Sequence, residues 1–378
     1  MHIIDWIIML GSMLGIVAYG VWKTRSVKNI KSYLLGDRDL PWWTIGLSIM
    51  ATQASAITFL STPGQAFDDG MRFAQFYFGM PIAMVILCIF VLPVYYRLQV
   101  YTAYEYLEGR FDLKTRSLTA IFFLVQRGLA AGITIYAPSI ILSTLLGWSL
   151  MWTNISMGAL VIIYTVAGGT KAVSVTQKQQ MLVILFGMFL AAVVVIWKLP
   201  EGLGFGDALT VAGKMGKLNV VDFTFDLQNR YTFWSGMLGV VFLVLSYFGT
   251  DQSQVQRYLS GKSLTESRLG LLFNGIVKVP MQFLVLLTGI LVFVFYQFSP
   301  QPLHFNSANV QQVVNSPYHE SYQALEAKFA GVFEEKKQAA GQLVLASRQN
   351  DQPKVEAMQA AMKDLAEEEK RSGGKPRN

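Results

Sequence analysis

Residues 51–64 read ATQASAITFLSTPG, a run of small, hydroxyl and amide side chains between two apolar stretches. Hydroxyl and amide groups can hydrogen-bond a polar ligand, and peptide and hydroxyl oxygens are the ligands that a hard cation prefers. Pro63 and Gly64 also favour a departure from regular helix here. The run therefore predicts an interrupted helix whose exposed backbone can hold a polar molecule or a cation.

The elements around this run have the composition of a membrane protein. The chain has 378 residues, of which 53% are hydrophobic and 15% are charged, and its mean hydropathy is +0.39. A helix needs about 20 apolar residues to cross a bilayer. We predict eight such helices, at about 3–22, 44–66, 73–97, 117–146, 150–168, 179–199, 233–256 and 269–298.

An interruption at bilayer depth has to be protected from lipid, because unpaired backbone groups are costly in hydrocarbon. Broken helices are tolerated where they line a cavity that holds a ligand or water. The fold class is therefore predicted as all-α, a polytopic membrane protein. Its expected function is to hold a small solute and a coupling ion at the break and to carry them across the membrane.

Lysine and arginine residues gather in alternate loops, which indicates the cytoplasmic side. This distribution predicts that both termini lie outside. We expect a bacterial-type inner (plasma) membrane. Nucleic-acid binding has no support in the sequence. The single Cys88 and three scattered histidines favour neither a disulfide framework nor a metal cluster. The loops with most cations are 23–38, 97–116, 171–178 and 257–268.

From residue 301 the composition changes to Gln, Ala, Lys and Glu, so we divide the chain into a transmembrane domain (1–300) and an outer soluble tail (301–378). Apolar residues recur at helical spacing on both sides of Asn350, which predicts a hairpin of two helices. The hairpin either has an ordinary solvated surface or forms a coiled coil that binds a partner. The last residues, RSGGKPRN, are expected to be disordered. The apolar positions are Tyr322, Leu325, Phe329, Phe333, Val355, Met358, Met362 and Leu365.

Three ionisable residues remain within or at the end of a predicted span: Arg127, Asp251 and Lys278. A charge near the bilayer centre costs about 2.5–3.5 kcal/mol on insertion scales, so such residues face the protein interior. Each either forms a buried ion pair or reaches the interface, or else it contacts a ligand.

Five stretches, in this order, resemble the sodium:solute symporter family, which includes sodium-coupled sugar, proline, iodide and monocarboxylate transporters. The resemblance implies two inverted repeats of five helices, as in the bacterial leucine transporter, after one extra helix. The helix expected after the tail is absent, so we expect that the chain is truncated after its eighth helix; the alternative is that the protein has lost its sodium site. The stretches are YLLGDRDLPWW (33–43), ATQASAITFLSTPGQAF (51–67), VYTAYEYLEGRF (100–111), YTVAGGTKAV (164–173) and YFGTDQSQVQRYL (247–259).

The same resemblance implies sodium as the coupling ion. The carbonyls of Ala51 and Ala54 would form half of its site, with Ser55 near by, and the missing helix would supply the hydroxyl ligands. Many relatives have an aspartate where this chain has Gln177. This difference leaves open how many sodium ions bind and whether a proton takes part.

The resemblance assigns the residues of the solute cavity less surely than those of the sodium site. The expected solute is a sugar or sugar acid first and a monocarboxylate second. A function of a different class is that of an input domain in a longer sensor protein. Enzymatic activity is not expected. The expected partners are a small organic solute, sodium and membrane lipid, and the sequence does not predict an oligomeric state. For the aromatic positions, plain helix packing is the alternative. The implied solute-binding residues are Gln53, Thr58, Tyr77, Tyr247, Phe248, Asp251, Gln252 and Lys278.

Overall fold

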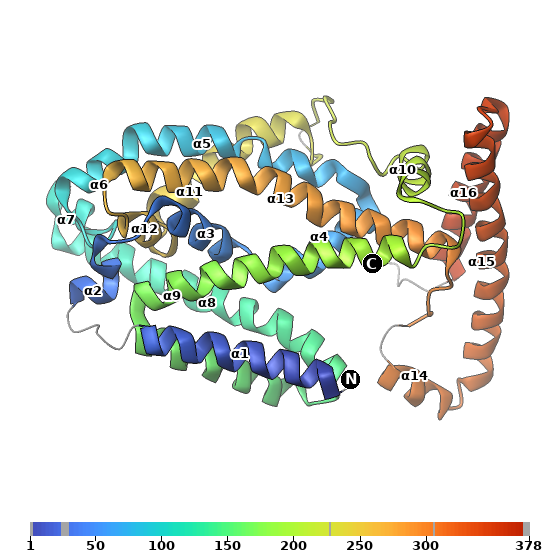
Figure 1. The fold of residues 1–378 in the computed structure, drawn as a ribbon, viewed down its shortest axis with the longest axis horizontal. Coiled ribbons are helices and arrows are strands. Elements are labelled where there is room, and N and C mark those ends of the chain that lie inside the picture. The colour runs from blue at the N-terminus through green and yellow to red at the C-terminus, as the bar shows by residue number, and fades with distance from the viewer. Residues whose placement is uncertain (1–2, 24–29, 227, 305–306, 373–378) are drawn as a thin grey trace. The chain divides into compact units, whose positions relative to one another are not determined.

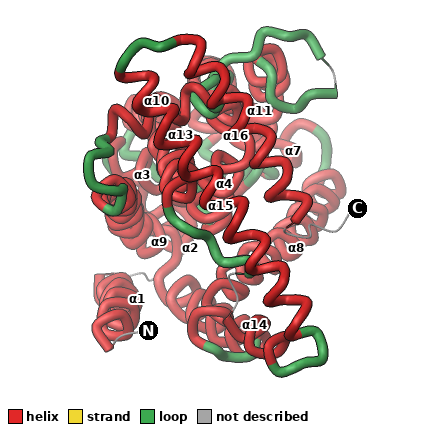
Figure 2. The backbone as a smooth tube through the Cα atoms, turned by 90° about the vertical axis from the view of Figure 1, so that its right-hand side faces the viewer, coloured by secondary structure: helices red, strands yellow, loops and turns green. Residues whose placement is uncertain are grey.

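The computed structural model describes residues 3–23, 30–226, 228–304 and 307–372. These residues form helices joined by loops, which confirms the predicted all-α class (Figures 1 and 2). The α-helices are α1 (Ile3–Lys23), α2 (Ile30–Leu35), α3 (Trp42–Gln53), α4 (Ala56–Asp69), α5 (Met80–Ile86), α6 (Leu92–Leu98), α7 (Glu105–Arg110), α8 (Leu113–Leu146), α9 (Leu150–Trp197), α10 (Phe205–Lys214), α11 (Val240–Thr250), α12 (Gln252–Leu259), α13 (Leu264–Phe298), α14 (Ser307–Val314), α15 (His319–Arg348) and α16 (Gln352–Ser372).

Short 3-10 and π-helical segments link several of these helices. The 3-10 segments are η1 (Gly36–Arg38) and η2 (Gly70–Tyr77), and the π-helical turns are η3 (Leu87–Val91) and η4 (Ser235–Gly239). Through η2 and η3, the chain stays helical from α4 to the end of α6. The predicted boundary between the second and third spans therefore lies inside one continuous helical stretch.

Each of the eight predicted segments is largely helical. Four stretches of the described chain are long and apolar enough to cross a membrane: Ile57–Leu98, Leu113–Thr144, Val173–Trp197 and Leu264–Phe298. Shorter apolar helices cover Ile3–Ile16, Leu150–Ile163 and Ser235–Thr250. The fifth and sixth predicted spans both lie in α9.

Gly169 divides α9 into two parts. Its φ is +57° and its ψ is −161°, a conformation that favours glycine. A Cβ at this position would lie 2.8 Å from the carbonyl oxygen of Tyr33. The fifth and sixth predicted spans are thus the two arms of α9, which meet at the kink at Gly169.

The chain forms two compact units. The first contains residues 1–62, 73–188 and 221–284, and the second contains residues 63–72, 189–220 and 285–378. This division runs through α4, α9 and α13, so the predicted boundary between a transmembrane domain and a tail near residue 300 stays a prediction.

In the first unit, four of the five stretches named above meet around α12. The Gln256 amide donates to the carbonyl oxygen of Leu34 at 2.8 Å and to the Thr170 hydroxyl at 2.7 Å. Gln252 joins the 100–111 stretch, accepting from the Ala103 N–H at 3.0 Å and donating to the Tyr101 carbonyl at 3.2 Å. Because buried polar groups need partners, these amides fix the connecting loops in place.

The second unit contains the predicted hairpin. Helix α15 ends at Arg348, Asn350 adopts a positive φ of 56°, and α16 begins at Gln352. Figure 2 shows α15 and α16 lying along each other. Within their contact Lys336 pairs with Glu369 at 2.5 Å, and both side chains are largely buried. The hairpin is confirmed. Of the end expected to be disordered, residues 371–372 belong to α16 instead, because the helix continues to Ser372, and residues 373–378 lie outside the described residues.

The apolar stripe predicted for the hairpin is only partly buried. Phe333, Val355 and Met362 are buried, whereas Leu325 is 45% exposed. At the other end of α15, Arg348 forms two hydrogen bonds with Asp207 of α10, at 2.8 and 3.0 Å. Together with the Gly204 N–H, this guanidinium lowers the pKa of the Asp207 carboxyl. A charged contact thus ties α10 to the hairpin.

Candidate functional site

The helix interruption predicted at residues 51–64 lies between Gln53 and Ala56. Ala54 has a φ of −85° and a ψ of 80°, which ends α3, and its N–H donates to the carbonyls of Met50 and Ala51 at 3.0 and 3.1 Å. Helix α4 begins afterwards, with the Ser55 hydroxyl accepting from the Thr58 N–H at 3.4 Å. Serine favours this capping position because its oxygen satisfies an otherwise unpaired amide. The predicted break is confirmed, and Figure 1 shows it between α3 and α4.

The oxygens at this break suit an alkali cation. Ala51, Ala54 and Ser55 follow one another across the break, and all three are half-buried. Peptide and hydroxyl oxygens are hard ligands without a formal charge, which is the kind of donor that unwound helices offer to sodium. Their assignment as sodium ligands stays a prediction.

Gln177 of α9 lies against the last turns of α3. Its side-chain oxygen accepts from the Ser48 hydroxyl at 2.8 Å and from the Thr52 hydroxyl at 3.2 Å. Thr52 shares its single hydroxyl proton between this oxygen and the Ser48 carbonyl, which lies 2.8 Å away. A neutral amide therefore joins α9 to the helix that ends at the break.

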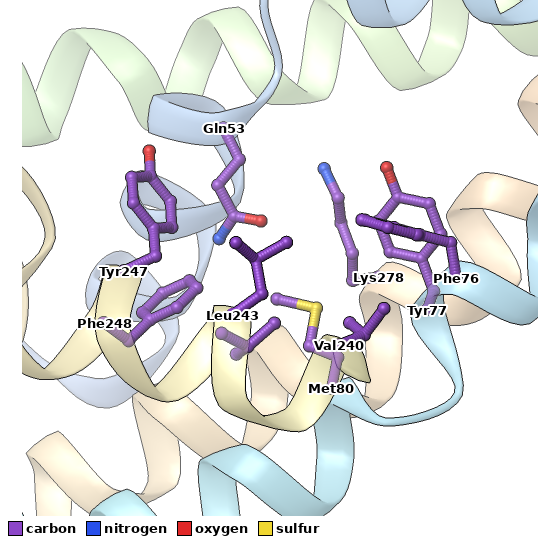
Figure 3. A pocket seen from close by; sticks show the side chains of 10 residues that line it. Gln53, Phe76, Tyr77, Met80, Val240, Leu243, Tyr247, Phe248 and Lys278 are labelled. Atoms are coloured by element: carbon purple, nitrogen blue, oxygen red, sulfur yellow. The ribbon is translucent and has the colours of Figure 1, made fainter. Parts of the chain in front are cut away.

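A cavity of about 320 Å³ adjoins the break. Gln53, the last residue of α3, projects into it together with Tyr77, Tyr247 and Lys278 (Figure 3). The remaining wall is apolar, so a few polar groups would orient a ligand within a hydrophobic enclosure. The apolar lining residues are Phe76, Met80, Val240, Leu243, Val244 and Phe248.

Among the described residues that line this cavity, Lys278 is the only one with a charge. Its side chain is 1% exposed, and its Nζ lies 6.0 Å from the centre of the Tyr77 ring. In the part of the chain that the structure describes, no carboxylate lies within ion-pair distance of Lys278. An ammonium held in an apolar wall without a counter-charge is costly, so the position favours an anionic ligand.

The same helix carries two further buried polar residues, which sequence reasoning missed. Asn274 and Gln282 lie one turn before and one turn after Lys278, and both are 0% exposed. Asn274 accepts from the Gln53 amide at 3.5 Å, while its Nδ2 and both amide atoms of Gln282 have no hydrogen-bond partner among the described residues. Spacing of four residues between polar side chains in an apolar helix could have identified this stripe.

The cavity unites five of the eight predicted solute-binding residues: Gln53, Tyr77, Tyr247, Phe248 and Lys278. The other three do not line it. Thr58 lies at the break, where its hydroxyl donates to the Gln53 carbonyl at 3.4 Å. Asp251 lines a second cavity and pairs with Arg127, and Gln252 holds the 100–111 stretch.

The chain resembles known proteins in sequence. The sequence profile of the "Sodium:solute symporter family" matches residues 33–316. The "Sodium/iodide cotransporter" of Homo sapiens is 33% identical over 71% of this chain and 41% of its own length. "Sodium-coupled monocarboxylate transporter 2" of Mus musculus is 32% identical over 71% of this chain and 44% of its own length.

The fold also matches a solved structure. The "Substrate-bound outward-open state of a Na+-coupled sialic acid symporter" superposes with a TM-score of 0.73 at 22% sequence identity, covering 96% of this chain and 78% of that chain. The chain spans less than half the length of the two curated relatives. With a profile that matches most of its length, and with a helix broken beside a cavity, the chain belongs to the sodium:solute symporter family, whose members are transporters and not enzymes.

Proposed function

We propose that this chain forms the solute-binding part of a sodium-coupled symporter that carries a small organic solute by alternating access. The observation that carries the proposal is the break at Ala54 and Ser55, because the last residue before it, Gln53, projects into the cavity. A ligand in the cavity and a cation at the break would therefore act on the same few residues.

Coupling follows from that shared geometry. Sodium bound by the carbonyls of Ala51 and Ala54 would stabilise the broken conformation, and the broken conformation presents Gln53 to the solute. Two ligands that favour the same state raise each other's affinity. The hydrogen bonds of Ser48 and Thr52 to Gln177 support the end of α3 from the other side.

The solute that we propose carries a carboxylate, as a sugar acid or a monocarboxylate does. Lys278 would pair with that group, while the Gln53 amide and the Tyr77 and Tyr247 hydroxyls would bind its polar remainder. A charge-assisted hydrogen bond contributes about 1.5–3 kcal/mol, enough to select an acid over a neutral sugar. Two of the similar relatives are named for anions, iodide and monocarboxylates, which also favours an anionic solute.

For the placement in the membrane we propose a bacterial-type inner membrane, with the cation-rich loops inside and the 301–378 tail outside. The bundle would contain two inverted repeats of five helices, of which the second begins with the helix around residues 233–256. The positions of lysine and arginine support this orientation.

Uptake by the full-length protein in proteoliposomes tests the proposal. With an inward sodium gradient, we expect uptake of labelled lactate or gluconate but little uptake of glucose, and none when potassium replaces sodium. Lys278→Gln should reduce uptake of the acid about 10- to 100-fold at low concentration, since it removes the charged partner.

Lys262→Gln is the matched control, because that lysine is half-exposed, lies just before the same helix and is absent from the cavity wall. Equal uptake in sodium and potassium would refute symport. Sodium-driven uptake of glucose in preference to both acids, unaffected by Lys278→Gln, would refute only the substrate class.

A further inference from the structure

The second unit contains a cavity of its own, of about 450 Å³, which we call the hairpin cavity. Helices α15 and α16 line one side, and the ends of α4 and α13 with the segment after α10 line the other. Its volume lies in the range of small-molecule sites. The lining residues fall within 67–68, 215–217, 293–303, 329–336 and 363–369.

The buried charges of the hairpin cavity already have partners. Lys336 is 5% exposed and pairs with Glu369, which also accepts from the Gln301 amide at 2.6 Å. The half-buried Lys217 donates to two backbone carbonyls of α4, at 2.9 and 2.6 Å. The other charged residues of the lining are exposed. An ion that entered would lose its hydration without gaining a buried counter-charge, so the cavity favours a neutral ligand.

Gln297 provides a buried hydrogen-bond acceptor in this lining. It lies in the last turn of α13 and is 1% exposed. Its Nε2 donates to the carbonyl of Phe293 at 2.9 Å, and since a carbonyl only accepts, the other amide atom is the oxygen. This Oε1 has no hydrogen-bond partner among the described residues. Because an unsatisfied buried acceptor is costly, the position favours a ligand that brings a donor.

Aromatic rings lie on both sides of the hairpin cavity. Phe67 of α4 and Phe293 of α13 meet edge to face, with their ring centres 5.5 Å apart. Phe329 of α15 is 8% exposed and belongs to the hairpin side. The face of an aromatic ring is the negative end of its quadrupole, so it attracts polarised hydrogens. The C–H groups of a sugar ring are of this kind, and its hydroxyls are donors.

We propose that the hairpin cavity binds a neutral carbohydrate of the size of a disaccharide. Hydroxyl groups would donate to Gln297 and accept from Lys336, because an ammonium has three donors and Glu369 takes one of them. The carbon faces of the sugar pack on the aromatic rings. This cavity shares no lining residue with the one that contains Lys278. It also takes a neutral molecule instead of an acid, so it does not depend on the proposed function.

A ligand in this place joins the hairpin to the ends of α4 and α13 and stabilises that arrangement. Maltose binding to the purified chain in lipid nanodiscs tests the site, because detergents with sugar head groups would compete. Titration calorimetry should show saturable binding. At saturating maltose, hydrogen exchange should slow in peptides of α16, whereas peptides of α11, which lines the solute cavity, should exchange as before.

Gln297→Leu should weaken maltose binding about tenfold, since it removes the acceptor. Without maltose its thermal unfolding midpoint should not fall, because the variant also removes an unsatisfied buried oxygen. Gln282→Leu is the matched control. Gln282 is a buried glutamine of the same helix but does not line the hairpin cavity, so the maltose affinity should stay within about twofold of the parent.

Phe329→Leu tests the hairpin side of the cavity. Loss of the aromatic face should weaken maltose binding about three- to tenfold. Phe333→Leu makes the same change one turn later on α15, at a buried ring that does not line the cavity, and should leave the affinity unchanged.

Four results would overturn the proposal. The first is the absence of saturable maltose binding, and the second is equal affinity of Gln297→Leu and Gln282→Leu. The third is protection of α11 in place of α16, which would locate the sugar in the solute cavity. The fourth is protection of α16 by gluconate and not by maltose, which would assign a charged ligand. None of them bears on sodium-driven uptake, which is measured without maltose.

Discussion

At the scale of single residues, the polar side chains of the candidate site could be predicted, whereas the apolar ones could not. Gln53, Lys278 and Tyr247, which the family resemblance implies as solute-binding residues, meet in one cavity although they belong to three helices. The apolar lining, such as Met80 and Val240, could not be predicted, because apolar side chains are frequent in every helix of this chain. Asp251 was expected to contact the solute, but its position is determined by its ion pair with Arg127, which residue types alone do not reveal.

Gln177 offers a prediction at this scale. In Gln177→Leu the Ser48 hydroxyl, which is 0% exposed, loses the partner that accepts its hydrogen bond. An unsatisfied buried polar group costs about 1–3 kcal/mol, so the thermal unfolding midpoint in detergent should fall. The double variant Ser48→Ala with Gln177→Leu removes both groups and should recover part of the loss. A double variant less stable than Gln177→Leu alone would contradict this role.

At the scale of elements, runs of apolar residues predicted all eight helical segments, since a membrane helix needs a long apolar stretch. Boundaries were less predictable where helices change direction. The seventh span was expected to reach residue 256, yet α11 ends at Thr250 because Asp251 turns out of the helix and caps α12. Aspartate is a preferred N-cap residue, because its side chain accepts a hydrogen bond from a backbone N–H two or three residues later, so this boundary was readable in principle.

Close approach of two helices in the second unit gives a prediction at the element scale. A Cβ on Gly289 of α13 would lie 2.1 Å from the carbonyl oxygen of Pro63 in α4, so only glycine fits. Gly289→Ala should therefore lower stability by about 1–3 kcal/mol, measured as the thermal unfolding midpoint in detergent.

Gly187→Ala in α9 is the matched control, because nothing lies within 4 Å of the place that its Cβ would take. Alanine favours helix over glycine by about 0.8–1 kcal/mol, so this variant should be neutral or more stable. A Gly289→Ala variant that behaves like Gly187→Ala would show that the two helices are not packed this closely.

At the scale of the whole molecule, the break in the helix of residues 42–69 organises the proposed function. The fold class and the broken helix followed from composition and from one polar run, because lipid allows few alternatives. The meeting of distant stretches around α12 did not follow, since it depends on long-range contacts such as those of Gln256 with Leu34 and Thr170. Sequence patterns report periodicity along one helix and carry little information about which helices become neighbours.

The most direct test of the central claim is hydrogen exchange at the break in the full-length protein, compared in sodium and in potassium at equal ionic strength. If the carbonyls of Ala51 and Ala54 bind sodium, peptides covering residues 51–59 should exchange more slowly in sodium, while the hairpin of α15 and α16 should exchange equally in both salts. The effect should depend on sodium concentration and saturate. Equal exchange at residues 51–59 in the two salts would contradict the account.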